Sequence, residues 1–233
     1  MNKLEVEREN IENNKIYENA FEWRFEFPEV LNDAGDFIGF DVVIGNPPYV
    51  LSRESFTKSI KKYFFSSYRT IHEKPNLYLL FIEKSHKFLN KNGEFSFIIP
   101  NSLTGVESAK KVREMLLNEY QLRKIVNLIG ETFENVGVES IILMSSNQVS
   151  DSNIKYQSIN SGIIDENNFN EISPAVYKSN RNYLFDISST AEEIPIIEKI
   201  KLKSDVLLKY FDVRVGLQAY ERGKENQSRL PKM

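Results

Sequence analysis

A chain of 233 residues, 41% of them hydrophobic, is long enough to bury the core of one domain with an appendage. It contains no cysteine, which excludes disulfides, thiolate metal sites and cysteine nucleophiles and agrees with a reducing cytoplasm. The net charge of -3 lacks the global positive bias of an autonomous nucleic-acid binder, although a local basic patch would be hidden in that average.

Residues 1–20 are charged and polar, and we expect them to form a helix or a frayed N-terminal arm. A signal peptide would be apolar here, and no apolar run approaches the length of a membrane span. We therefore expect a cytoplasmic protein that is not inserted in a membrane. In residues 21–148, short apolar runs alternate with helix-like stretches, which predicts an α/β layer built on a buried, mostly parallel sheet.

Four runs rich in Ile, Val, Leu or Phe, each closed by Gly, Pro, Asn or Ser, are predicted to be strands. They span Phe40 to Gly45, Glu94 to Pro100, Arg123 to Ile129 and Ser140 to Ser146. The spacing of apolar residues predicts helices over Leu77 to Leu89 and over Ser108 to Tyr120. The second helix is predicted to keep Arg113 outside its apolar face.

Residues 149–212 have a different texture, rich in Asn and Ser, with short β-like pieces such as Ile154 to Ile159. A final helical stretch spans Glu192 to Lys203. This region is predicted to be a connector of small strands and a helix. Residues 213–233 are polar and charged, and we expect them to be disordered.

The first predicted strand ends in the turn Asn46-Pro47-Pro48-Tyr49. Proline fixes φ and keeps the preceding residue extended, so the Asn46 side-chain oxygen and the Pro47 carbonyl are predicted to be fixed hydrogen-bond acceptors. A planar amino group must be drawn toward tetrahedral geometry before it can attack, and fixed acceptors on its N–H groups do this. Tyr49 offers a flat face for an extruded base. The alternative is that this segment is only a strand-terminating turn.

These pieces resemble the second half of the catalytic domain of type IIG restriction-modification DNA methyltransferases, the adenine-N6 group. The resemblance covers residues 21–146. Besides the Asn-Pro-Pro-Tyr strand it rests on Phe21 to Val30, Asn76 to Tyr78, Phe95 to Asn101 and Glu131 to Glu134. Val213 to Tyr220 resembles the beginning of that family's TaqI-like target-recognition domain. The resemblance implies a partial Rossmann-like methyltransferase fold in residues 21–148 and the start of a recognition domain in residues 213–233.

The resemblance also implies roles for single residues. Asn46 to Tyr49 would form the catalytic loop that receives adenine, and Phe133 would be the second aromatic that sandwiches the base, unless it is an ordinary buried Phe. Asn101 would line the pocket, or serve as a helix N-cap or turn residue. The implied cofactor is S-adenosylmethionine, with Asn46 and Pro48 forming part of its site, and the implied substrate is an adenine flipped from double-stranded DNA.

The chain departs from the family pattern because it contains no Gly-x-Gly. The glycine-rich loop and the acidic residue that hold the cofactor would then be missing, with the first three strands of the usual seven. We expect an exposed apolar sheet edge, and a second chain that supplies the missing half. Two alternatives remain open: a methyltransferase that acts on cytosine N4 or on protein glutamine, and a non-catalytic remnant or subunit that assembles with a cofactor-binding chain.

The segment Leu51 to Lys74 carries six Lys and Arg residues against two Glu, a local charge of +4, interleaved with aromatic rings. A DNA-facing segment needs such cations for phosphates and such rings for unstacked bases. The candidate phosphate contacts are Arg53, Lys58, Lys61 and Lys62. The alternative is an amphipathic helix with core rings and solvated lysines. His72 and His86 have no second ligand at metal spacing, so we predict no metal site.

Overall fold

The computed structural model describes residues 5, 8–9, 26–50, 56–72, 76–130, 139–160, 163–189 and 192–212. These belong to two units, which divide between positions 191 and 192. The second unit contains α7 (Glu193–Lys203), which confirms the predicted final helix, and the 3-10 helix η6 (Leu207–Lys209). The predicted recognition-domain start at 213–233 lies outside the described residues, as does most of the predicted N-terminal arm.

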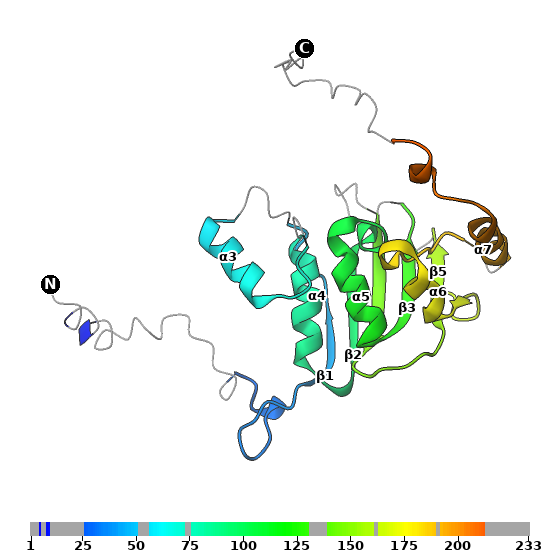
Figure 1. The fold of residues 1–233 in the computed structure, drawn as a ribbon. Helices are drawn as coiled ribbons and strands as arrows, with labels where there is room; N and C mark the ends of the chain where they lie inside the picture. The colour runs from blue at the N-terminus through cyan, green and yellow to red at the C-terminus, as the bar shows by residue number, and fades with distance from the viewer. Residues whose placement is uncertain are drawn as a thin grey trace, which may run out of the picture. The chain divides into compact units, whose positions relative to one another are not determined.

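A six-stranded sheet with the order β1-β2-β4-β3-β5-β6 forms the first unit (Figure 1). Its strands are β1 (Phe40–Gly45), β2 (Leu89–Pro100), β3 (Gln121–Leu128), β4 (Ser140–Ser146), β5 (Ile154–Ile159) and β6 (Asn170–Ile172). All four predicted strands are present, and β2 begins five residues earlier than predicted because it continues directly from the preceding helix. The α/β fold class is confirmed.

The sheet is mixed, so the prediction of a mostly parallel sheet is wrong. The pairs β1–β2 and β3–β5 are parallel, whereas β2–β4, β3–β4 and β5–β6 are antiparallel. The connection from β3 to β4, residues 129–139, is shorter than the dozen or so residues of a crossover. Neighbouring strands joined in this way pair antiparallel, and β4 therefore runs against both of its neighbours.

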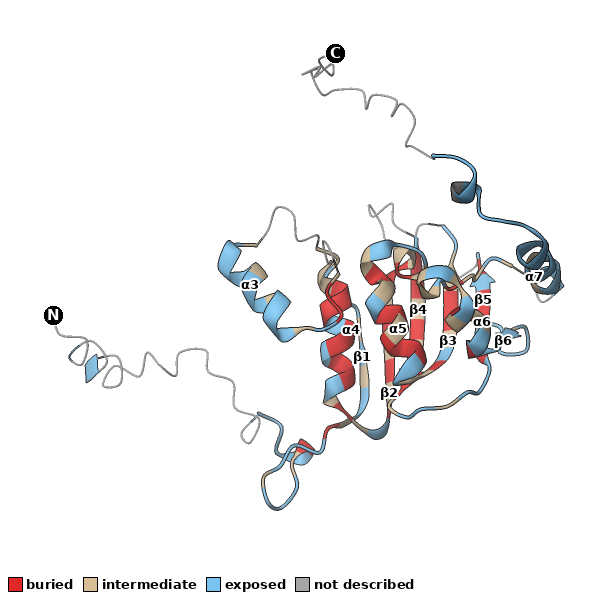
Figure 2. Ribbon diagram, viewed as in Figure 1, coloured by how far each residue is buried: buried red, intermediate tan, exposed pale blue. Residues whose placement is uncertain are grey.

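Helices cover one face of the sheet (Figure 1). They are α4 (Leu77–Phe88), α5 (Lys110–Asn118) and α6 (Pro174–Ser179), and the 3-10 helices of this unit are η2 (Pro28–Val30), η3 (Asn101–Thr104), η4 (Glu107–Ala109) and η5 (Arg181–Tyr183). The alternating residues Phe95, Phe97 and Ile99 of β2 are at most 5% exposed and belong to the buried core between the sheet and these helices (Figure 2). The helix α3 (Lys58–Ser67) contains no buried residue.

The small strands predicted within residues 149–189 are present and belong to the main sheet. Strand β5 pairs in parallel with β3, from Lys124 opposite Lys155 to Leu128 opposite Ile159. Strand β6 then pairs antiparallel with β5. This part of the chain therefore extends the sheet beyond β3.

Strand β1 lies at the other edge of the sheet and pairs only with β2 among the described residues. Val42 and Ile44 are 57% and 77% exposed. They lie opposite Glu94 and Ser96, and so on the opposite face from Phe95 and Phe97. An apolar strand that is open at its edge and on one face is a site for pairing with another segment. The predicted apolar edge is confirmed.

Among the described residues, no helix combines the length and the apolar character required to cross a membrane.

Candidate active site at the end of strand β1

The Asn46-Pro47-Pro48-Tyr49 segment, here called the corner, begins where β1 ends, at the carboxyl edge of that strand. The last strand residue, Gly45, lies opposite Phe97. A Cβ atom at position 45 would lie 3.3 Å from the Phe97 ring, a tight contact. Glycine therefore lets β1 approach β2 closely just before the chain turns. Ligands of open α/β sheets bind outside such strand ends.

The two predicted acceptors of the corner differ in their exposure. Asn46 is exposed, and its side-chain amide has no hydrogen-bond partner within the described part of the chain. Pro47 is buried, which fixes its backbone, and no backbone N–H among the described residues donates to its carbonyl oxygen. The corner is thus anchored through the buried Pro47, while the exposed Asn46 side chain faces solvent.

Tyr49 is half-buried and anchored at its hydroxyl. This hydroxyl donates to the backbone oxygen of Ile98 on β2 at 2.9 Å. Burial raises the pKa of Tyr49 above its ordinary value, while a hydrogen bond with Ser140 acts in the opposite direction. The hydroxyl is therefore protonated at neutral pH and fixes the ring from β2. The Tyr49 ring, predicted to stack on a base, is therefore held in one orientation by this hydrogen bond.

The first turn of α4 supports the corner from the side. Tyr78, 2% exposed, packs edge-on against the Tyr49 ring with centroids 6.3 Å apart, and its hydroxyl lies 3.3 Å from the Ser102 hydroxyl. The backbone N–H of Leu77 donates to the carbonyl of Val50 at 2.9 Å. We did not predict this supporting role, although the sequence places Asn-Leu-Tyr at the start of a predicted helix.

Asn76 precedes α4 and carries a buried side-chain oxygen. This Oδ1 atom has no hydrogen-bond partner within the described residues. Buried polar atoms are satisfied in most native structures, so an unsatisfied one calls for an explanation. Asn76 adjoins Leu77, whose N–H holds the residue that follows the corner, and its Oδ1 is thus a third acceptor near the candidate site.

Asn101 lies at the end of β2, and its polar groups are engaged locally. Its side-chain amide donates to Glu139 Oε2 at 2.6 Å, and its backbone N–H donates to the Glu139 carbonyl at 2.9 Å. It begins η3, for which Pro100 is the N-cap residue. These contacts place Asn101 in a turn and tie it to the residue before β4.

The remaining predicted site residues divide between α3 and the undescribed parts of the chain. Arg53 and Phe133 lie outside the described residues. Lys58, Lys61 and Lys62 lie on α3, and none of them forms an ion pair within the described residues. Within the predicted basic segment, the described helix is α3, and its rings do not form a core: Phe65, for example, is 58% exposed.

Of the described glycines, Gly39 and Gly45 leave no room for a cofactor, whereas an added Cβ at Gly130 would meet nothing within 4 Å. A glycine that cradles a ligand needs open space at its α-carbon. At Gly39 that space is taken by the backbone of Asn90, 2.6 Å from an added Cβ, and at Gly45 by the Phe97 ring. No group of three His, Cys, Asp or Glu residues that could hold a metal ion occurs in the described ranges.

The family model of the Eco57I restriction-modification methylases matches residues 1–133, more than half of the chain. The chain belongs to this family. The predicted resemblance to restriction-modification methyltransferases is confirmed. Among curated relatives, type II methyltransferase M.BstVI of Geobacillus stearothermophilus is 36% identical over 104 residues, 44% of this chain and 18% of the relative. Type II methyltransferase M.AccI of Acinetobacter calcoaceticus is 30% identical over 148 residues, 58% of this chain and 27% of the relative.

This Eco57I-family chain therefore spans about a fifth of M.BstVI and about a quarter of M.AccI. A solved type I restriction-modification methyltransferase subunit from Streptococcus thermophilus aligns with a TM-score of 0.45 at 16% identity, covering 80% of this chain and 35% of that chain. A likeness of that size adds nothing to the family assignment.

Proposed function

We propose that this chain provides the target-base half of a DNA methyltransferase that transfers a methyl group from S-adenosylmethionine to N6 of an adenine extruded from double-stranded DNA. One observation carries the proposal: in a restriction-modification methylase, the exposed Asn46 amide lies at the end of β1 without a partner among the described residues. Such an enzyme acts where DNA lies, in the cytoplasm of a bacterial or archaeal cell.

The chemistry assigned to this chain is the activation of the target amine. Asn46 Oδ1 and the Pro47 carbonyl accept hydrogen bonds from the two N–H groups of the adenine amine, which localises the nitrogen lone pair for attack. The Pro47 carbonyl does not have to move, because Pro47 is buried and proline-locked. The Tyr49 ring, fixed through its bond to Ile98, supports the plane of the base.

Three experiments on methyl acceptors test the substrate. The chain is supplied with the cofactor-binding portion of M.BstVI and with tritium-labelled S-adenosylmethionine. We expect label in duplex oligonucleotides that contain adenine. Label in adenine-free duplexes would indicate cytosine N4, and label in a glutamine-bearing peptide would indicate protein methylation; either result would contradict the proposal.

We propose further that a second chain or segment supplies the cofactor half by pairing along β1. The support is the apolar strand whose Val42 and Ile44 are exposed at the sheet edge. At Gly39 and Gly45, on either side of the strand that leads to the corner, the space beside the glycine is taken by backbone and by a ring. Calorimetric titration of the chain alone with S-adenosylmethionine should therefore give no binding heat, and measurable binding without a partner would contradict this arrangement.

We also propose that Asn101 lines the base pocket through its tie to Glu139 and that Arg53 and Phe133 act beside it. In this proposal Phe133 covers the second face of the adenine, and Arg53 binds a phosphate together with the lysines of α3. Residues 213–233 are proposed as the start of the recognition domain that selects the DNA sequence.

A further inference from the structure

We propose that α3 is a DNA-clamping helix in which Lys58, Lys61 and Lys62 bind backbone phosphates around the exposed ring of Phe65, which stacks on a base that has lost its neighbour or partner. This inference rests on the proposed function, because it takes DNA as the substrate. The inference goes beyond the proposed function because it assigns a base-stacking residue and a set of phosphate contacts to α3, a helix outside the corner.

The four side chains lie on one face of α3. Their positions follow the i, i+3, i+4, i+7 spacing that brings residues to the same side of a helix. Phe65 is 58% exposed, and the three lysines form no ion pair within the described residues. The exposed Phe65 ring thus shares a helix face with three lysines that are not neutralised by a carboxylate of the described residues.

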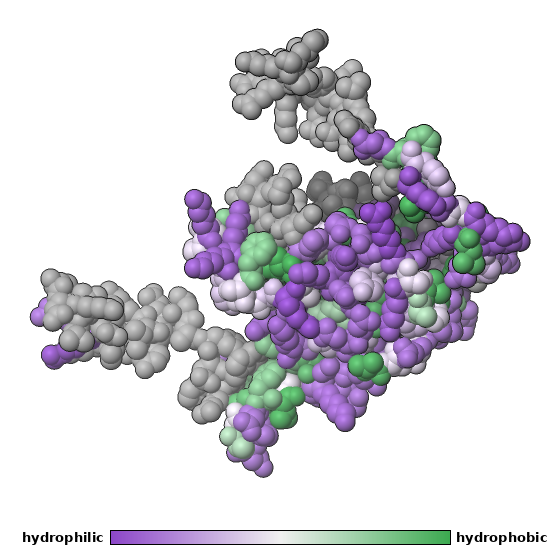
Figure 3. Space-filling view, in the orientation of Figure 1, coloured by the Kyte–Doolittle hydropathy of each residue, from purple (hydrophilic) through white to green (hydrophobic). Residues whose placement is uncertain are grey.

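The exposed Phe65 ring is not needed for the packing of α3. The other side of the helix packs through Phe64, whose ring lies 5.4 Å from that of Phe56 and 6.1 Å from that of Tyr68. Tyr63, next to these rings, is also 59% exposed. Apolar and charged side chains accordingly lie side by side on the surface over α3 (Figure 3). Exposed rings gathered in this way mark an interaction site.

The charge of this region selects the partner. Residues 56–72 contain four Lys and Arg residues and no Asp or Glu, although the whole chain has a net charge of -3. A polyanion is therefore attracted to this region. Single-stranded or locally opened DNA combines phosphates for the lysines with base faces for the ring, and stacking on an aromatic residue tolerates any sequence.

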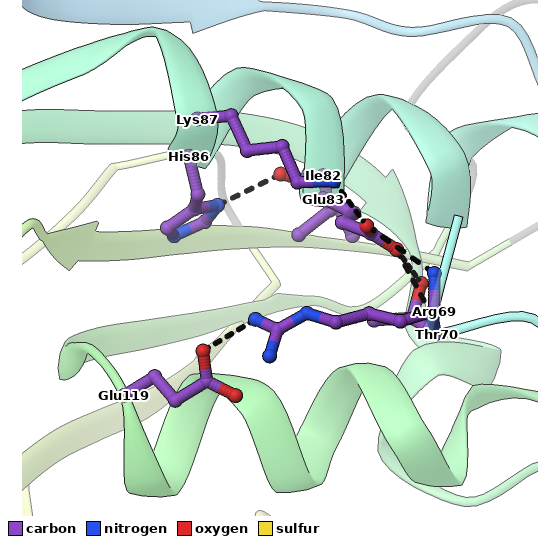
Figure 4. Close-up of polar contacts among 7 residues, drawn as sticks. All are labelled: Arg69, Thr70, Ile82, Glu83, His86, Lys87 and Glu119. Atoms are coloured by element: carbon purple, nitrogen blue, oxygen red, sulfur yellow. Dashed lines mark hydrogen bonds and ion pairs between the residues drawn. The ribbon is translucent and has the colours of Figure 1, made fainter. Parts of the chain in front are cut away.

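A buried carboxylate fixes α3 to the layer that holds the corner (Figure 4). Glu83 on α4 is 1% exposed and accepts from the Thr70 N–H at 3.0 Å, the Thr70 hydroxyl at 2.7 Å and Lys87 Nζ at 2.7 Å. Arg69 pairs in addition with Glu119. The segment that follows α3 is thereby tied to α4, the helix whose Tyr78 supports Tyr49. The segment that follows the clamp and the corner are therefore both attached to α4.

The test measures DNA binding by the full chain with fluorescence anisotropy across a series of salt concentrations. The probes are a duplex and the same duplex with one abasic site, which leaves the opposite base unpaired. Replacing Lys58, Lys61 and Lys62 together by Gln should lower the slope of log affinity against log salt by about 2.7, at roughly 0.9 for each phosphate contact. Phe65→Leu should weaken binding to the abasic duplex about tenfold, and the intact duplex less. Phe65→Trp should keep the affinity.

Matched controls separate these effects from loss of charge or of an apolar side chain elsewhere. Gln at Lys199, Lys201 and Lys203 removes the same charge from α7, and Phe37→Leu removes a ring that is 40% exposed outside α3. Circular dichroism establishes that each variant is folded. The proposal is overturned if the chain binds neither probe, if the α3 and α7 triple variants have equal slopes, or if Phe65→Leu and Phe37→Leu behave alike.

A protein partner at the same surface gives a different result. If α3 were a contact between copies of the chain, Phe65→Leu would change the sedimentation coefficient and leave the DNA affinity unchanged, which would also overturn the proposal. Ile163→Lys, at an exposed residue outside α3 and outside the corner, should bind both probes like the unaltered chain. Methyl label in cytosine or in a peptide, together with the expected effects of the α3 variants on DNA binding, would reject the proposed function alone. Methyl label in adenine, together with unchanged DNA binding in the α3 variants, would reject the clamp alone.

Discussion

The Tyr49 hydroxyl shows how a single bond holds the candidate site. Tyr49→Phe keeps the ring but removes the 2.9 Å bond to the Ile98 carbonyl. We expect the free energy of unfolding to fall by about 1 kcal/mol, the usual net value of such a bond. Urea denaturation measures the change. Tyr63→Phe, on an exposed ring of α3, is the control and should change stability by only a few tenths of that; equal effects would contradict the anchoring role.

His86 gives the fold a pH dependence. Its ring lies between those of Phe95 and Tyr120, at 4.4 and 4.3 Å, and burial lowers its pKa to about 4. The unfolded chain takes up this proton near pH 6.5, while the folded chain does not until about pH 4. The contribution to stability is therefore complete above pH 6.5 and is lost as the pH falls toward 4, by up to about 1.4 kcal/mol for each pH unit.

Denaturant unfolding between pH 7 and pH 4 tests this prediction. In His86→Leu the slope of stability against pH should be shallower than in the unaltered chain. His72→Gln is the matched control, because it replaces a partly exposed histidine and leaves the buried His86 ring in place. Identical slopes for the unaltered chain and His86→Leu would contradict the assignment.

Single residues also show where sequence reasoning stops. The corner was located from the sequence because two consecutive prolines after an apolar run leave few backbone conformations. Its supports were not, because Tyr78 and Ile98 are distant in sequence and meet Tyr49 only after the strands pair. Arg113 was predicted outside the apolar face but is fully buried, since carbonyls such as those of Leu103 and Asn182 accept from its guanidinium.

At the scale of elements, local patterns predicted strands and helices but not their pairing. Apolar runs such as Ile141–Met144 of β4 indicate a strand whichever direction it runs. Its direction depends on the length of the connection from β3, so the antiparallel pairing was missed. Helix α3 has an aromatic pattern that suits either a core or a surface, and only the structure showed that none of its residues is buried.

The carboxylate of Glu83 is predicted to fix the segment after α3. Burial alone would raise the pKa of Glu83, but its bonds with Lys87 and Thr70 outweigh burial and lower it. Glu83→Gln should reduce the free energy of unfolding by about 2 kcal/mol, because it weakens charge-assisted bonds to a buried group. It should also increase hydrogen exchange at the Thr70 amide.

Glu119→Gln is the matched control for this change. Glu119 is partly exposed and pairs with Arg69 in the same cluster. A surface pair of this kind contributes less than about 1 kcal/mol, so the control should be nearly neutral. Equal losses in the two variants, or unchanged exchange at Thr70 in Glu83→Gln, would show that Glu83 does not anchor the segment.

At the scale of the whole molecule, the open edge of β1 predicts association. An exposed apolar edge strand pairs with other chains when its own partner is absent. Ile44→Lys places a charge on the edge, so sedimentation velocity should show less self-association than for the unaltered chain. Ile163→Lys, at a residue 74% exposed outside the sheet, is the control and should not change the distribution. The same sedimentation profile for the unaltered chain and both variants would contradict association through β1.

The central claim is that the corner offers fixed oxygen acceptors to a planar amino group. The most direct measurement is a nuclear magnetic resonance titration of the chain, labelled with nitrogen-15, with 9-methyladenine and with 9-methylpurine, which lacks the amine. We predict that 9-methyladenine shifts the Asn46 side-chain and Tyr49 backbone signals, that 9-methylpurine does so far less, and that Asn46→Ala removes the difference. Equal responses to the two purines, or shifts confined to residues away from the corner, would contradict the claim.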